Sequence, residues 1–167
     1  MTTRPRLVIV FVVDGLRPDS ITCEETPTLF RLRAEGVSFA SSHAVFPTVT
    51  RVNAAALSTG AQPGSNGLLG NQLYVSAIDR GRALDSGNYR NLLDLERVSG
   101  GRLLLAPTLA ERLHGLGLRL AGVSSGSTGS AFLLNPRAPA GIGVVVNGYF
   151  DPGKTVAYPA EVSEAIL

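Results

Sequence analysis

The chain opens on a continuous run of apolar residues. Residues 6–13 read RLVIVFVV, with seven apolar side chains in succession, and the run ends at Asp14 and Gly15. Strands that are covered on both faces of a parallel sheet show this pattern, whereas half-exposed strands alternate apolar and polar residues. The run therefore predicts a first strand inside an α/β fold.

Helix and strand patterns alternate after this run. Residues 26–36 predict a helix with Thr26 at the N-cap, Pro27 at the first helical position and Gly36 at the end. Further strands are expected at 37–46, 71–78, 119–125 and 141–150, further helices at 50–60, 106–117, 126–135 and from 158 onward, and a shaped loop at 61–70, while 79–102 show no clear period. This alternation predicts a three-layer α/β sandwich with a mainly parallel sheet.

Composition favours a globular domain. Of the 167 residues, 44% are hydrophobic and 17% are charged, a balance that supports a sizeable core. We therefore expect residues 1–167 to form a single α/β domain. The helical pattern at 158–167 stops without a cap, which predicts an incomplete fold and the N-terminal part of a larger catalytic domain.

Charge and cysteine content exclude several functional classes. The net charge of +2 comes from 15 basic and 13 acidic residues without a basic cluster, which argues against binding of a nucleic-acid duplex. The single cysteine, Cys23, excludes an internal disulfide. The opening apolar run is too short to span a bilayer and lacks a small-residue cleavage site, so we expect no membrane association and a cytoplasmic location.

Two groups of residues have a pattern suited to chemistry. Asp14 follows the first expected strand, where a carboxylate is well placed to bind a divalent metal, although an aspartate that only caps the next turn fits equally well. Thr50 opens an expected helix, whose N-terminus favours an anion, and Asn53 lies one turn on. The alternative is that Thr48 or Thr50 caps the helix and Asn53 is a surface residue.

These residues also carry a family resemblance. Asp14 and Gly15, then FPTVTRVNAAALSTG at 46–60, then PGSNGLLGN at 63–71 resemble the type I phosphodiesterase/nucleotide pyrophosphatase family of the alkaline phosphatase superfamily. A looser similarity continues through 122–135. The resemblance implies that Asp14 binds metal, that Thr50 is the nucleophile and also contacts metal, and that Asn53 holds the phosphoryl oxygens of the substrate.

The resemblance also implies a reaction. It predicts hydrolysis of small phosphodiesters or nucleotides through a phospho-threonine intermediate, with two divalent metal ions, usually zinc. A phosphonoacetate hydrolase or another phosphate-ester hydrolase of the superfamily are alternatives. A further alternative is an inactive fragment, because a two-zinc site takes about six Asp and His ligands, mostly from a later Asp-His-Gly segment, whereas this chain has only His43 and His114.

Two other features are weaker candidates. The family often has histidine in a P-x-x-H-G segment, where this chain has Asn66, and we expect this change to affect loop packing more than catalysis. The glycine-rich residues 123–130 follow an expected strand, so they either line the substrate cleft or form an ordinary strand-to-helix turn.

Overall fold

The computed structural model describes residues 7–148 and 156–162. The chain divides into two compact units, Met1–His43 (unit 1) and Ala44–Leu167 (unit 2). None of the helices among the described residues has the length and apolar character needed to cross a membrane. The single domain and the compartment expected from the sequence stay predictions.

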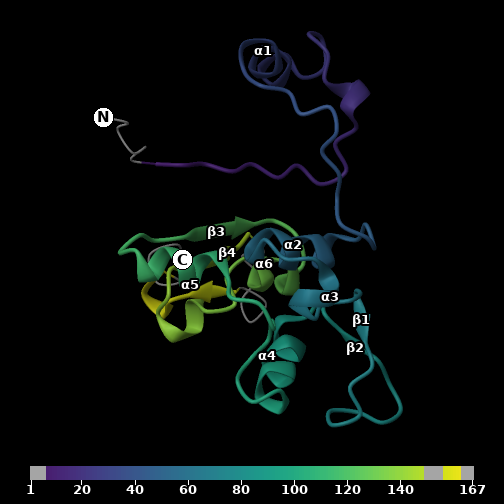
Figure 1. Ribbon diagram of the computed structural model, residues 1–167, viewed down its shortest axis with the longest axis vertical. Helices are drawn as coiled ribbons and strands as arrows, with labels where there is room; N and C mark the ends of the chain where they lie inside the picture. The colour runs from purple at the N-terminus through teal and green to yellow at the C-terminus, as the bar shows by residue number, and fades with distance from the viewer. Residues whose placement is uncertain (1–6, 149–155, 163–167) are drawn as a thin grey trace. The chain divides into compact units, whose positions relative to one another are not determined.

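Unit 1 holds two short helices (Figure 1). They are a 3-10 turn at Pro18–Ser20 and helix α1 at Pro27–Glu35, which begins and ends where the sequence pattern placed it. The Thr26 hydroxyl donates to the Ser20 carbonyl at 3.0 Å, and Arg33 Nη2 donates to the Ile21 carbonyl at 2.8 Å. No residue of α1 is buried, so local hydrogen bonds rather than a core organise this unit.

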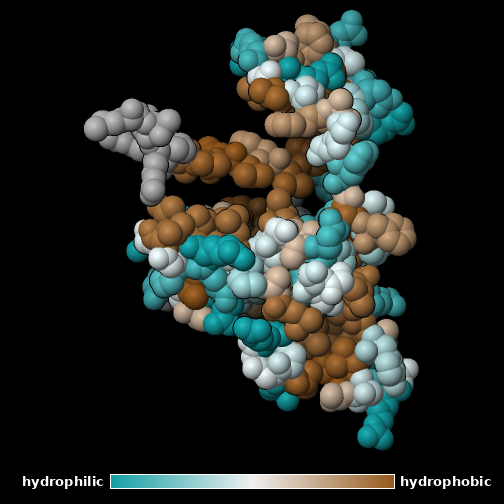
Figure 2. Space-filling model, in the orientation of Figure 1, coloured by the Kyte–Doolittle hydropathy of each residue, from teal (hydrophilic) through white to brown (hydrophobic). Residues whose placement is uncertain are grey.

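The first expected strand does not form in unit 1. Residues 7–13 are extended but have no strand pairing, and their side chains are between 56% and 85% exposed. Figure 2 shows this segment as a hydrophobic stretch. A strand is stable only when its backbone groups pair with a neighbour, and no such pairing is present for these residues. The prediction of a buried strand here is wrong for the described structure.

The strand expected at 37–46 is also absent. These residues form turns and irregular backbone, and Val37 and Phe39 are each 79% exposed. The apolar residues of this segment are interrupted by serines and alanines, so burial of the segment as a strand would gain little hydrophobic stabilisation.

Unit 2 contains the sheets and the remaining helices (Figure 1). The labelled helices among its described residues are α2 (Thr50–Thr59), α3 (Pro63–Asn66), α4 (Tyr89–Val98), α5 (Leu109–Gly115) and α6 (Thr128–Leu134), with a 3-10 turn at Ala138–Ala140. The labelled strands are β1 (Gln72–Leu73), β2 (Leu84–Asp85), β3 (Ala121–Ser124), β4 (Val144–Asn147) and β5 (Ala157–Tyr158).

The main sheet of unit 2 is built on a β–α–β crossover. Strand β3 pairs in parallel with β4, in a register that runs from Ala121 opposite Val144 to Ser124 opposite Asn147, and α6 connects the two strands. Strand β5 pairs antiparallel on the other side of β4, whereas β1 and β2 form a separate antiparallel pair. The parallel pair and its connecting helix confirm the α/β class predicted from the sequence.

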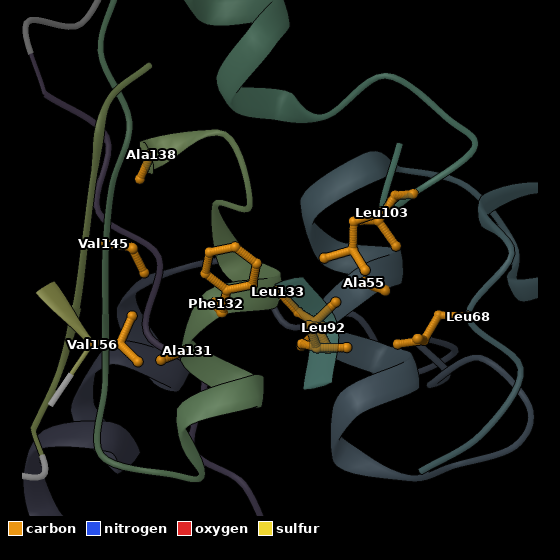
Figure 3. Close-up of a cluster of buried hydrophobic side chains, with 12 residues drawn as sticks. Ala55, Leu68, Leu92, Leu103, Ala131, Phe132, Leu133, Ala138, Val145 and Val156 are labelled. Atoms are coloured by element: carbon orange, nitrogen blue, oxygen red, sulfur yellow. The ribbon is translucent and has the colours of Figure 1, made fainter. Parts of the chain in front are cut away.

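Helix α6 is the centre of the core (Figure 3). Its residues Ala131, Phe132 and Leu133 are fully buried. Val145 of the sheet lies on one side of the helix and Ala55 of α2 on the other, within one hydrophobic cluster. The sheet, α6 and α2 are therefore successive layers, and burial of apolar side chains between them is the main stabilising contribution.

Helices α4 and α5 are well capped. The side chain of Asn88 accepts from the Arg90 amide at the start of α4, a helix that the sequence pattern left unassigned. At the start of α5, Thr108 and Glu111 form a capping box, in which each side chain bonds the backbone of the other. Residues 160–162 are helical, and the rest of the helix expected at 158–167 lies outside the described residues.

Candidate functional site

Asp14 of unit 1 stands in a tight turn. The Leu16 amide donates to the Val13 carbonyl at 3.3 Å, and Gly15 adopts a φ of 77°. Residues with a side chain rarely adopt this conformation, so the glycine allows the chain to turn directly after the carboxylate. Asp14 is exposed.

Thr50 of unit 2 is the first residue of α2. The N-cap position belongs to Val49, which has an extended backbone and no side-chain hydrogen bond to the helix. The N–H groups of a first helical turn lack helical partners and attract negative charge, and Val49 provides no side-chain acceptor for them. Thr50 is exposed at this end of the helix, and its role as the nucleophile stays a prediction.

Asn53 lies one turn after Thr50 and is bonded to the loop before the helix. Its Oδ1 accepts from the Val45 amide at 3.0 Å, and its Nδ2 donates to the Val49 carbonyl at 3.1 Å. Longer bonds from Nδ2 reach the carbonyls of Val45 at 3.4 Å and Pro47 at 3.5 Å. The side chain is half-buried, so Asn53 is not merely a surface polar residue.

The arginines beside the two motifs are both paired with carboxylates. Arg17 bonds Asp19 through Nε at 2.9 Å, and both side chains are largely exposed. Arg51 donates from Nη1 to Asp85 Oδ1 at 2.8 Å, and only 17% of its side chain is exposed. Because each guanidinium already faces a carboxylate, neither is a ready ligand for a substrate phosphate.

Two side chains of the glycine-rich loop at 123–130 form hydrogen bonds that fix the start of α6. Ser127 caps α6 by accepting from the Ser130 amide, and the Thr128 hydroxyl donates to the Gly87 carbonyl at 3.2 Å. The amide of Asn147, at the end of β4, donates to the Gly126 carbonyl at 2.9 Å. These bonds describe a strand-to-helix turn, one of the two alternatives that the sequence left open.

Neither histidine belongs to a metal cluster within the part of the chain that the structure describes. His43 is exposed in unit 1, and His114 is exposed in the last turn of α5, as its helical pattern predicted. Across residues 7–148 and 156–162, no group of three or more His, Cys, Asp or Glu side chains is arranged to hold a metal ion.

Thr50 and Asn53 are therefore brought together by one helix in unit 2. Asp14 belongs to unit 1, so the metal site expected to join Asp14 and Thr50 stays a prediction. Sequence reasoning missed the bonds of Arg51 to Asn71 and Asp85, which lie 20 and 34 residues further along the chain. No local pattern signals pairings at such separations.

Asn66 has a structural position. Its side chain is fully buried, Nδ2 donates to the Ala61 carbonyl at 3.0 Å, and Oδ1 accepts from the Leu68 amide at 2.9 Å. Both ends of the amide thus hold the loop around α3. This geometry fits the expectation that position 66 serves loop packing.

Comparison with known proteins covers both candidate groups. A family model described as type I phosphodiesterase / nucleotide pyrophosphatase matches residues 8–115, which include Asp14, Thr50, Asn53 and Asn66. The looser resemblance at 122–135 lies beyond the matched range. No curated protein and no solved structure matches the chain. Since the match spans well over half of the sequence, the chain belongs to the type I phosphodiesterase/nucleotide pyrophosphatase family.

Proposed function

We propose that this chain carries the nucleophile of a hydrolase that cleaves phosphodiester or pyrophosphate bonds in small molecules such as nucleotides. The observation that carries the proposal is the position of Thr50, exposed as the first residue of α2 behind an N-cap residue with no side-chain acceptor. An alkoxide or a phosphoryl oxygen at that point is stabilised by the helix N-terminus. Membership of the family supports the same reaction class.

The proposed reaction has two steps. The Thr50 oxygen attacks phosphorus and forms a new P–O bond, while the bond from phosphorus to the leaving oxygen breaks and that oxygen leaves with the bonding electrons and takes up a proton. Water then attacks phosphorus and forms a new P–O bond, while the bond from phosphorus to the Thr50 oxygen breaks. A proton given up by the water restores the Thr50 hydroxyl, and the phosphate product leaves. Both steps need donors around the phosphoryl oxygens, and the first turn of α2 supplies backbone N–H groups for that purpose.

Asn53 is proposed to assist at the same phosphoryl group. Its Nδ2 donors are directed at backbone carbonyls, and the bonds to Val45 and Pro47 are long, at 3.4 Å and 3.5 Å. Bonds of this length are weak, so a phosphoryl oxygen, which carries charge, would replace them at little cost. The shorter bonds to the Val45 amide and the Val49 carbonyl would still hold the side chain.

The metal requirement is met only in part by the described residues. Asp14 and Thr50 offer the oxygen ligands that divalent cations accept, but the described ranges contain no cluster of three ligands. A pair of zinc ions, when bound, would favour ionisation of the threonine hydroxyl and neutralise the phosphoryl oxygens. Because the donor set does not by itself fit two metals, we assign no step to them.

The test uses the chain with added Zn²⁺ and bis(4-nitrophenyl) phosphate as substrate. Thr50→Ala should reduce turnover by at least about a thousandfold, since the nucleophile is lost. Thr50→Ser keeps a hydroxyl and should retain measurable turnover, and mass spectrometry of a quenched reaction should locate the phosphoryl group on residue 50.

Thr48→Ala, two residues earlier and also exposed, is the matched control. Equal turnover in the wild type and Thr50→Ala would remove Thr50 from this role, and an inactive wild type would favour the inactive-fragment alternative.

A further inference from the structure

Arg51, the residue after Thr50, is anchored at two points outside its own helix. Its Nε donates to Asn71 Oδ1 at 3.0 Å, and its Nη1 donates to Asp85 Oδ1 at 2.8 Å. The Arg51 side chain is 17% exposed, whereas that of Asp85 is 56% exposed. When two nitrogens of a planar guanidinium are hydrogen-bonded, both the position and the orientation of the group are fixed. Arg51 therefore ties the first turn of α2 to the β1–β2 pair.

Residues 85–87 pack closely against Arg51 through Gly87 and against α6 through Gly129. A Cβ added to Gly87 would overlap Nη1 of Arg51, and a Cβ added to Gly129 of α6 would overlap the Ser86 carbonyl oxygen. Neither glycine is among the residues with positive φ, so the constraint is close approach: Gly129 lies against backbone, whereas Gly87 lies against the end of the Arg51 side chain and its replacement would displace that side chain. Residues 85–87 therefore contact Arg51 on one side and the first turn of α6 on the other.

Hydrogen bonds complete this connection. The Gly87 carbonyl accepts from the Gly129 amide at 2.9 Å and from the Thr128 hydroxyl at 3.2 Å. The same hydroxyl accepts from the Tyr89 amide at 3.2 Å. We call the connected set Arg51, Asn71, Asp85, Gly87, Thr128 and Gly129 the Arg51 junction. It joins the first turn of the helix that carries Thr50 to the first turn of α6, next to the carboxyl ends of β3 and β4.

We propose that Arg51 is a positioning residue, which holds Thr50 in place relative to α6 through the Arg51 junction. The inference rests on the proposed function of Thr50. A direct role of Arg51 at the substrate phosphate is disfavoured, because Asp85 neutralises its charge and its fork is directed at Asn71 and Asp85. Because Arg51 directly follows Thr50 in the first turn of α2, any shift of the Arg51 backbone is shared by Thr50.

An ordinary surface ion pair in the same unit provides the contrast. Arg97 bonds Asp94 at 3.0 Å within α4, and the two side chains are 73% and 49% exposed. Such a pair joins one turn of a helix to itself and contributes little to stability. The Arg51–Asp85 pair joins residues 34 apart and includes a largely buried guanidinium, so its loss should be transmitted to two helices.

Amide hydrogen exchange tests the connection without any need for activity. Arg51→Ala removes the bond to Asp85, and Asp85→Asn weakens it by removing the carboxylate charge, so in both variants the amides of Asn53 in α2 and Gly129 in α6 should exchange at least about tenfold faster. The Arg112 amide, which bonds Thr108 at the start of α5, serves as the internal reference. Asp94→Asn is the matched control. Unchanged exchange at Asn53 and Gly129 would overturn the proposal.

Steady-state kinetics then separate positioning from phosphate binding. With Zn²⁺ and bis(4-nitrophenyl) phosphate, Asp85→Asn and Arg51→Ala should lower kcat by about tenfold to a hundredfold with little change in KM, since a misplaced nucleophile slows the chemical step. Arg51→Lys keeps the charge near Asp85 but not the fork, so it should restore part of kcat. A raised KM with unchanged kcat would overturn the positioning role. An inactive wild type, or full activity of Thr50→Ala, would instead overturn the proposed function, and the exchange experiment would still decide the junction.

Discussion

The side chain of Asn53 pairs with the backbone of Val45 in both directions. Its Oδ1 accepts from the Val45 amide at 3.0 Å, and its Nδ2 donates to the Val45 carbonyl at 3.4 Å. With the bond from Nδ2 to the Val49 carbonyl at 3.1 Å, one side chain closes the loop 45–49 onto the first turn of α2. Asn53 therefore shapes the backbone that leads into Thr50, whatever it contributes at the substrate.

Replacement of Asn53 should destabilise unit 2. Asn53→Ala removes every bond to the loop and should lower the free energy of unfolding by about 1–3 kcal/mol, since half-buried backbone groups lose their partners. Asn53→Asp keeps the acceptor for the Val45 amide but places a carboxylate oxygen near two carbonyls, so it should be at least as destabilising. Urea unfolding monitored by circular dichroism measures both effects. Gln72→Ala, an exposed amide, is the control, and a difference from wild type below about 0.5 kcal/mol for Asn53→Ala would contradict the role.

Elements with strong local signals were predictable from the sequence. Helix α1 begins at Pro27 and is followed by Gly36, and α5 (Leu109–Gly115) lies within the range 106–117 predicted for it, although its capping box of Thr108 and Glu111 was not predicted. Caps and Pro or Gly positions act within a few residues, so a linear pattern contains the information. The strands β3 and β4 and helix α6 between them were also found, because apolar β-branched and turn residues alternate there.

The first run of the chain shows where sequence patterns stop being sufficient. Residues 7–13 have the composition of a buried strand but are exposed and unpaired, since a strand depends on a neighbour that composition cannot name. Conversely, α4 was missed although Asn88 caps it and Leu92 is fully buried. Tyr89, Leu92 and Leu93 do recur at helical spacing, but this short helix lies within a longer polar segment, 79–102, over which no single period is visible.

The candidate site also has features that the sequence predicted and features that it could not predict. The position of Thr50 at a helix N-terminus followed from the helix pattern after it, and the structure places it there. The bonds of Asn53 to the preceding loop and of Arg51 to Asp85 could not be predicted, because both depend on how distant backbone segments fold back on α2.

Gly129 should be intolerant of a side chain. Alanine normally stabilises a helix by about 1 kcal/mol relative to glycine. In α6 the added Cβ would overlap the Ser86 carbonyl, so Gly129→Ala should instead destabilise the protein by about 1–3 kcal/mol through overpacking. Thermal unfolding should show a lower midpoint for this variant.

A second helical glycine provides the matched control for Gly129. Gly115, in the last turn of α5, has no atom within 4 Å of an added Cβ. Gly115→Ala should therefore be neutral or slightly stabilising. If both variants changed the midpoint in the same direction by similar amounts, close packing at Gly129 would not be the cause.

Asn66 should matter for stability rather than turnover. Asn66→Leu leaves the Ala61 carbonyl and the Leu68 amide without their side-chain partners and should cost about 2–4 kcal/mol. Asn66→His, the residue that the family often has, should retain more stability, because a neutral imidazole also offers one donor and one acceptor. Chemical denaturation ranks the variants, with exposed Ser65→Ala as reference. Equal stability of Asn66→Leu and wild type would exclude the structural role.

Glu96 faces a small cluster of charges between α4 and α5. Arg137 lies between two carboxylates, with Nη1 3.5 Å from Glu96 Oε1 and Nε 3.6 Å from Glu111 Oε1. Arg102 lines the same small cavity of about 70 Å³. Burial raises the pKa of Glu96, and the nearby Arg137 charge opposes this shift only partly. The charged form of Glu96 is therefore less favourable in the folded protein than in the unfolded chain.

The raised pKa of Glu96 determines whether its contribution to the free energy of unfolding rises or falls with pH. Because the folded-state pKa of Glu96 lies above its unfolded value, the native protein binds more protons between the two values. The contribution of Glu96 is thus fully present below the unfolded pKa and is lost as pH rises through the folded pKa. The free energy of unfolding of wild type minus that of Glu96→Gln should fall as pH rises through this window, as measured by urea unfolding at several pH values. Glu161→Gln, at an exposed carboxyl, is the matched control, and a wild-type minus Glu96→Gln difference that rises with pH would show that attraction to Arg137 outweighs burial.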